Sequence, residues 1–117
     1  MSDIHILIVD DEEVIRDLLQ RVLNAYTLTF AVDGIDGLEK YRVRRYDLVI
    51  TDYTMPGRNG LELAEEMQKV HPHQRILLLS SNSAEVLAEA RSQKVFTMLR
   101  PFSVNQLQQQ VAELLTP

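Results

Sequence analysis

The stretch ILIVDDE at residues 6–12 places four apolar residues directly before three acids. The same arrangement recurs along the chain, because LVIT (48–51) precedes Asp52, ILLL (76–79) precedes Ser80 and TML (97–99) precedes Arg100. Apolar runs this short are typical of strands buried on both faces. Each such strand is therefore expected to end at a polar residue.

The segments between these runs are longer and have helical periodicity. In residues 13–24, apolar side chains recur at one-turn spacing and leave a polar face. We expect strands at 4–9, 27–32, 47–51, 76–79 and 95–99, and helices at 13–24, 35–44, 61–70, 84–92 and 103–115, with Ser103 capping the last. Strands separated by helices require crossover connections, so the sequence predicts a single parallel sheet with helices on both faces, an α/β architecture.

Composition narrows the class of protein further. The 117 residues are expected to form one domain, 1–117, and they carry 17 acids against 12 Lys and Arg. The absence of cysteine excludes disulfides, thiolate metal sites and a Cys nucleophile. Acids at the N-terminus do not resemble an export signal, and the net charge of −5 argues against direct binding of nucleic acid. We therefore expect a cytoplasmic protein that contacts neither membrane nor nucleic acid.

The polar residues that end the strands should meet at one edge of the sheet. If the first and third strands are neighbours, their ends lie about 5 Å apart, which brings Asp10, Asp11 and Asp52 together. Two carboxylates about 4 Å apart repel by roughly 4 kcal/mol at an effective dielectric constant of 20, so one acid must be protonated, a cation must neutralise them, or both. Carboxylate oxygens with access to water suit Mg²⁺, and Mn²⁺ accepts similar ligands.

Ser80 and Arg100 complete this predicted site. A hydroxyl and a fixed cation opposite the acids would complement a tetrahedral anion, so the pattern indicates phosphoryl chemistry with Asp52 as the acceptor. Taken singly, these residues fit plainer roles: Asp10-Asp11 and Ser80-Ser81 as helix caps, Asp52 as a turn residue, Arg100 as a surface charge. Their occurrence at successive strand ends favours the phosphoryl site.

These motifs resemble the receiver domain of two-component response regulators, including stand-alone chemotaxis-type receivers. The resemblance covers essentially the whole chain and rests on ILIVDDE (6–12), DYTMPGRNG (52–60) and RPF (100–102). It implies a flavodoxin-like (βα)5 fold with strand order 2-1-3-4-5. It also implies a phosphoacceptor signalling domain that assists its own phosphorylation and dephosphorylation, rather than an enzyme acting on other substrates.

The resemblance also assigns roles to residues. It implies that Asp52 accepts phosphate from the phosphohistidine of a histidine kinase or phosphotransfer protein, with Ser80 and Arg100 contacting the phosphoryl group. Asp11, Asp52 and the Thr54 carbonyl would bind Mg²⁺ directly, and Asp10 would bind it through water. Thr54 and Asn82 would tune the phosphoryl lifetime. A downstream protein target, a monomer or weak homodimer, no output domain and a cis Arg100–Pro101 peptide are further expectations.

Two positions depart from the family pattern and keep an alternative open. Arg100 replaces the usual Lys, and Thr97 stands where many receivers have a switching Tyr or Phe. Arginine and lysine are not equivalent at this position, because the guanidinium of arginine is planar and bulkier than the ammonium of lysine. The alternative is a pseudo-receiver that acts as a constitutive protein-interaction scaffold. A small-molecule phosphohydrolase is disfavoured, because Thr54 stands where such enzymes need a second acid.

A basic run and two histidines lie outside this site. Lys40, Arg42, Arg44 and Arg45 gather near the end of the second helix, where cations are favourable, and we expect a solvated face there. His71 and His73 flank Pro72 in a loop, and no metal site is expected from them.

Overall fold

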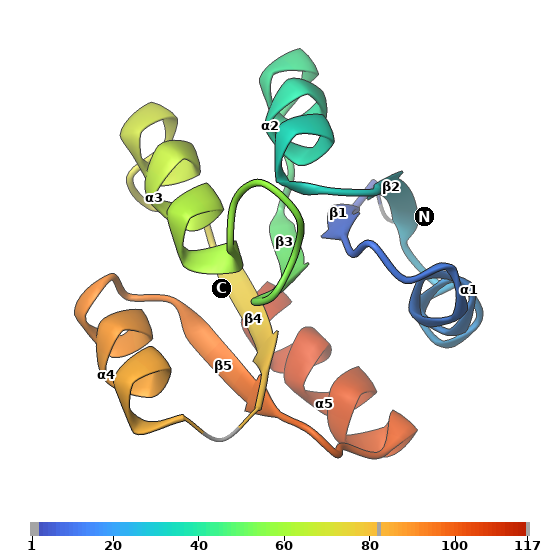
Figure 1. Cartoon of the computed structure of the whole chain (residues 1–117). Helices are drawn as coiled ribbons and strands as arrows, with labels where there is room; N and C mark the ends of the chain where they lie inside the picture. Colours follow the sequence, from blue (N-terminus) through green and yellow to red (C-terminus); the bar gives the residue numbers. More distant parts are fainter. Residues whose placement is uncertain (1–2, 82, 117) are drawn as a thin grey trace.

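The computed structural model of this protein describes residues 3–81 and 83–116. The described residues form strands and helices in strict alternation (Figure 1). In chain order these are β1 (His5–Val9), α1 (Glu13–Val22), β2 (Thr27–Ala31), α2 (Gly34–Val43), β3 (Leu48–Asp52), α3 (Gly60–Val70), β4 (Ile76–Ser80), α4 (Ala84–Ser92), β5 (Phe96–Leu99) and α5 (Val104–Leu115).

The strands form one parallel sheet in the order β2-β1-β3-β4-β5, which confirms the predicted fold class and strand order. The chain runs outward from β1 to β2 and then returns to the other side of β1 for β3. Helices α2, α3 and α4 cover one face of the sheet, and α1 and α5 cover the other (Figure 1). The reversal between β1 and β3 opens a crevice at the carboxyl ends of the strands.

Each face of the sheet carries its own hydrophobic core. Alternate residues of β1 point to opposite faces, so Leu7 and Val9 pack under α2 and α3 while Ile6 and Ile8 pack under α1 and α5. All four are fully buried, as are the central residues of β3 and β4. This explains why these strands are continuous apolar runs rather than alternating patterns.

Most predicted boundaries are accurate to within two residues, and the differences have local causes. The first helix ends at Val22 rather than at residue 24, because Leu23 has left helical geometry and the chain turns toward β2. The third strand extends to include Asp52, and the fourth extends to include Ser80. Ser103 caps the last helix as predicted, in a reciprocal capping box with Gln106.

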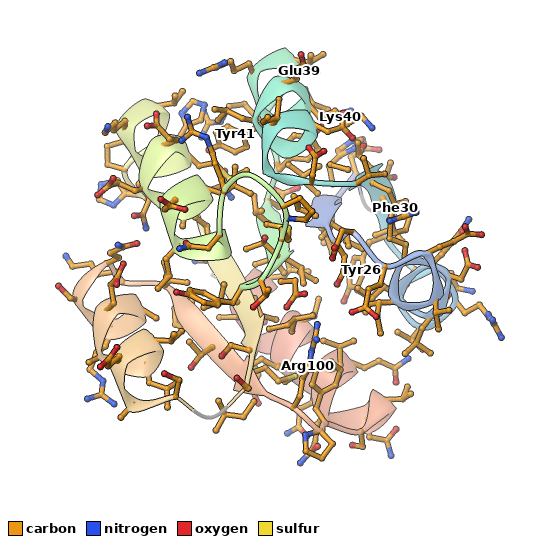
Figure 2. All side chains as sticks on the ribbon, in the orientation of Figure 1. Tyr26, Phe30, Glu39, Lys40, Tyr41 and Arg100 are labelled. Carbon is orange, nitrogen blue, oxygen red and sulfur yellow. The ribbon has the colours of Figure 1, made fainter. Side chains whose placement is uncertain are left out.

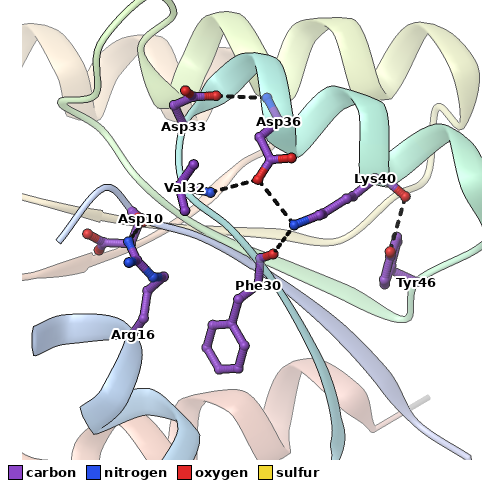
Figure 3. Close-up of polar contacts among 8 residues, drawn as sticks. All are labelled: Asp10, Arg16, Phe30, Val32, Asp33, Asp36, Lys40 and Tyr46. Atoms are coloured by element: carbon purple, nitrogen blue, oxygen red, sulfur yellow. Dashed lines mark hydrogen bonds and ion pairs between the residues drawn. The ribbon is translucent and has the colours of Figure 1, made fainter. Parts of the chain in front are cut away.

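The connection from β2 to α2 is held by side chains (Figure 3). Asp33 caps α2 by accepting the Asp36 amide at 2.8 Å. The Asp36 carboxylate accepts the Val32 amide at 3.0 Å and lies 3.2 Å from Lys40 Nζ. Lys40 in turn donates to the main-chain oxygen of Phe30 at 2.7 Å. These contacts fix the outer edge of the sheet on the β2 side.

Candidate functional site

The four polar positions predicted from the sequence lie at the carboxyl ends of four neighbouring strands. Asp10 directly follows β1, and Asp52 ends β3, the strand paired with β1. Ser80 ends β4, and Arg100 directly follows β5, where its amide donates to the Ser80 main-chain oxygen at 3.0 Å. The sheet order therefore brings these residues to one edge, as the sequence predicts.

A cluster of carboxylates forms the acidic side of the site. Asp10, Asp11, Glu12 and Asp52 each offer one oxygen, and these oxygens lie within 4.8 Å of one another. Asp10 and Asp52 are buried, whereas Asp11 and Glu12 are exposed. Glu12 was not predicted as part of the site. The signal for it was its place as the third acid in the run that follows β1.

The Arg100 guanidinium lies against both buried acids. Its Nη2 is 3.2 Å from Asp52 Oδ1 and 3.7 Å from Asp10 Oδ2. Arg100 reaches this position from the connection between β5 and α5 (Figure 2). The Arg100–Pro101 peptide is cis, as expected. Arg100 is therefore a fixed cation in the site, in contrast to the plainer reading as a surface charge.

Backbone amides orient the two buried carboxylates. The Glu12 amide donates to Asp10 Oδ1 at 2.9 Å, and the Tyr53 amide donates to Asp52 Oδ1 at 2.9 Å. Arg16 holds the main-chain oxygen of Asp10 at 2.8 Å (Figure 3). The other oxygen of Asp10 and the Ser80 hydroxyl are buried without a hydrogen-bond partner. Buried polar atoms without a partner are costly, and the Ser80 hydroxyl is one that lines the cavity described below, which is typical of a ligand site.

The electrostatics of the site follow from burial. Burial raises the pKa of Asp10 to about 6, and the hydrogen bond from the Glu12 amide only partly opposes it. Burial also raises the pKa of Asp52, while the Arg100 guanidinium beside it acts in the opposite direction. The acids therefore resist ionising together unless a cation joins them.

A cavity of about 320 Å³ opens between the acids and the β4 and β5 ends. Its lining residues are Asp11, Glu12, Asp52, Tyr53, Thr54, Ser80, Ser81 and Arg100. Oxygen ligands on one side suit Mg²⁺, and the hydroxyl and guanidinium on the other suit phosphoryl oxygens. Of the predicted residues, Asn82 lies outside the described part of the chain.

Comparison with known proteins agrees with this geometry. The response regulator receiver domain family matches residues 6–112 of this chain, and the chain belongs to that family. Sporulation initiation phosphotransferase F of Bacillus subtilis (strain 168) is 29% identical, over 98% of this chain and 96% of its own length. Regulator of RpoS of Escherichia coli (strain K12) is 34% identical over 96% of this chain, which corresponds to only 35% of that protein.

Solved structures show the same fold. Chemotaxis protein CheY4 of Vibrio cholerae matches with a TM-score of 0.89 and 25% identity, over 97% of this chain and 99% of that chain. Response regulator protein TrrA of Thermotoga maritima, solved in complex with Mg²⁺–BeF, matches with a TM-score of 0.84 and 34% identity, over 95% and 98% of the two chains. Among the described residues, no helix is long and apolar enough to cross a membrane.

Proposed function

We propose that this receiver domain accepts a phosphoryl group on Asp52 from a phosphohistidine of a histidine kinase or phosphotransfer protein. The observation that carries the proposal is the convergence of three kinds of group on one cavity: the acid cluster, the unpartnered Ser80 hydroxyl and the Arg100 guanidinium. The domain acts as a phosphoacceptor and not as an enzyme with a separate substrate.

In this proposal Asp52 is the nucleophile, and the acids together also serve as metal ligands. Asp10, Asp11, Asp52 and the Thr54 carbonyl would hold Mg²⁺, with Mn²⁺ as a substitute, and the ion would neutralise charge on the phosphoryl oxygens. Asp52 Oδ1 is held by the Tyr53 amide, which leaves the second carboxylate oxygen to attack phosphorus. As the new O–P bond forms, the P–N bond of the phosphohistidine breaks, and its electron pair stays on the imidazole.

Ser80 and Arg100 stabilise the acquired charge. A phosphoryl group adds about −1.5 to −2 charge and three acceptor oxygens. The Ser80 hydroxyl can donate to one of these oxygens, and Arg100 can exchange its contact with Asp52 for another. Because Ser80 ends β4 and Arg100 follows β5, their movement would carry the loops before α4 and α5. A downstream protein would then bind the altered surface.

Reaction with a small phosphodonor tests the acceptor assignment. In acetyl phosphate and Mg²⁺, the intact mass should rise by one phosphoryl group, and Asp52→Asn should abolish the gain. Asp17→Asn, an exposed acid on α1, serves as the matched control and should react like the wild type. Equal labelling of Asp52→Asn would show that another residue is the acceptor. A wild-type chain that gains no mass would favour the constitutive scaffold.

Metal binding can be measured separately from phosphorylation. A ligand that binds only the folded state at a hundredfold excess over its Kd adds about 2.7 kcal/mol to the free energy of unfolding. Mg²⁺ should therefore raise the melting temperature of the wild type and of Asp17→Asn, but much less that of Asp11→Asn. A metal-independent melting temperature in the wild type would contradict the proposed Mg²⁺ site.

A further inference from the structure

A second cavity lies at the opposite end of the sheet from the acids. It has a volume of about 370 Å³, within the range of small-molecule pockets. Residues 45–47, just before β3, and residues 71–75, just before β4, form most of its wall, together with Ile4 and Leu115. These two segments are distant in sequence, and the pairing of β3 with β4 brings them side by side. We call this cavity the basic pocket.

Four cationic or protonatable side chains line the basic pocket: Arg45, His71, His73 and Arg75. Arg42 and Arg44 lie immediately beside it in the chain. In the described part of the chain, the ion pairs involve Lys40, Arg58, Lys69 and Arg100, and none involves these arginines. Within the described residues, the charges of Arg45 and Arg75 are therefore not neutralised by an ion pair.

The acidic side chain that lines the basic pocket, that of Asp47, already accepts a hydrogen bond. Asp47 Oδ2 accepts the His5 amide at 2.9 Å, so this carboxylate anchors the start of β1. One engaged carboxylate among four positive or protonatable groups leaves the basic pocket with an excess of hydrogen-bond donors.

Hydrogen bonds and ring packing hold the part of the wall that precedes β4. The buried Tyr41 hydroxyl donates to Gln74 Oε1 at 2.8 Å, and the Gln74 amide donates to the Arg75 main-chain oxygen at 3.1 Å. The His71 ring packs edge-on against Tyr41, with 5.8 Å between ring centroids. Arg75 Nη1 donates to the main-chain oxygens of Leu114 and Thr116, which holds its guanidinium in place at the end of α5. Arg75 and His71 are therefore held in place by contacts within the protein, which reduces the entropy cost of binding a ligand through them.

The chemistry of the wall selects an anion over a metal ion. In residues 3–81 and 83–116, the only group of three or more potential metal ligands is the acid cluster at the other end of the sheet. Guanidinium groups pair with phosphate in a planar, two-point geometry, and imidazoles add further donors. The volume and the donor set together fit a small molecule with phosphate groups.

We propose that the basic pocket binds a small phosphate-bearing anion through Arg45, His71, His73 and Arg75. This function is independent of phosphorylation at Asp52, because the two cavities lie at opposite ends of the strands. It also gives Arg45, one member of the basic run, a role beyond the solvated face that the sequence suggested.

Titration with pyrophosphate in metal-free buffer tests the proposal, with Asp52→Asn as the background so that Asp52 cannot be phosphorylated; binding at Ser80 and Arg100 would be recognised by shifts at those residues instead. Backbone amide shifts should move at residues 45–47, 71 and 73–75 and saturate with a midpoint below about 1 mM at constant ionic strength. Arg45→Gln should raise that midpoint about fivefold or more, because a charge-assisted pair is lost. Arg91→Gln, an exposed cation on α4, is the matched control and should leave it unchanged.

Each other outcome would overturn the proposal. Shifts that grow linearly without saturation would indicate general screening of the protein's charges by pyrophosphate. Shifts that appear near cationic residues over the whole surface would indicate the same. An unchanged midpoint in folded Arg45→Gln would remove the basic pocket as the site. Citrate binding as tightly as pyrophosphate would show that the pocket selects charge rather than phosphate.

Discussion

Asp10 shows how a single buried residue sets the stability of the acid site. It is 1% exposed, its Oδ2 lacks a hydrogen-bond partner, and its pKa is raised to about 6. In the unfolded chain the same carboxyl has a pKa near 3.8. The folded state therefore binds the proton more tightly than the unfolded state, and stability is lost as pH rises from about 4 through 6.

The substitution Asp10→Asn should remove the loss of folding stability that accompanies rising pH. An amide keeps the oxygen that accepts from the Glu12 amide but carries no charge at any pH. Without metal at pH 7.5, we expect the variant to be more stable than the wild type by roughly 2 kcal/mol, and this gain should shrink toward pH 4. Urea unfolding at several pH values measures both. Asp17→Asn should show no such trend, and a gain that is constant with pH would contradict the electrostatic cause.

Gly60 is a second residue on which the site depends. A Cβ at this position would lie 2.4 Å from the Asp52 main-chain oxygen and 2.5 Å from Leu78 Cδ1. The oxygen belongs to the backbone of β3 and cannot move without displacing Asp52. The first turn of α3 can therefore sit against β3 only if this residue is glycine.

Gly60→Ala should lower the free energy of unfolding by about 2–4 kcal/mol, which urea titration measures. Gly37→Ala is the comparison. Its Cβ would meet two Val9 methyl groups at 3.0 and 3.1 Å, which are side-chain atoms, and the helix gains alanine propensity. The loss in free energy of unfolding should be clearly smaller in Gly37→Ala than in Gly60→Ala. Equal losses would show that the backbone contact at Asp52 is not decisive.

At the residue scale, the sequence predicted which side chains meet but not how they meet. Asp10, Asp52, Ser80 and Arg100 could be found because strand ends in a parallel sheet share an edge. The contact of Arg100 with two acids could not be predicted, because it depends on the conformation of a long side chain. Glu12 was missed since it begins the connection to α1, where the direction of a side chain does not follow strand alternation.

At the scale of elements, helix starts and helix ends were predicted with similar accuracy, all within two residues. Asn59 and Glu62 form a reciprocal capping box at α3, as Ser103 and Gln106 do at α5. Such caps are local sequence signals, so the residues that begin these helices can be predicted. The end of α1 carries no glycine or proline stop signal, and the packing of the next turn decides it.

Ser103→Ala should destabilise α5 through its first turn. The variant loses the acceptor for the Gln106 amide, at 3.0 Å in the structure, and an N-cap change of this kind costs about 1 kcal/mol. Chemical denaturation measures the loss. Ser92→Ala, at the last residue of α4, makes no capping contact and should cost less than half as much. A similar loss in both variants would show that the cap has no specific effect.

At the scale of the whole molecule, one sheet joins two cores into a single unit. Leu63 on α3 and Leu107 on α5 are both buried, on opposite faces. Neither core is closed without the sheet between them, so the two should unfold together. The sequence predicted both layers, because the central strands β1, β3 and β4 are apolar on both sides.

Leu63→Ala and Leu107→Ala should each cost about 2–5 kcal/mol and shift one common transition. Urea titration followed by circular dichroism should show a lower midpoint with an unchanged slope in both variants. Val43→Ala, at a position that is 82% exposed, should have little effect. Two separate transitions in either leucine variant would show that the faces fold independently.

The hydrogen bond from Lys40 to the main-chain oxygen of Phe30 affects how readily the edge of the sheet could pair with a strand of another molecule. Because the Ala31 carbonyl accepts the Asp10 amide toward β1, the preceding carbonyl, that of Phe30, faces away from the sheet. An outer strand with free carbonyls invites a foreign strand to extend the sheet. Here the Lys40 ammonium already occupies one outward carbonyl, and a charged lysine at the margin of a sheet opposes the addition of another strand. At the Phe30 position, an incoming chain would have to displace this ammonium before it could pair with β2.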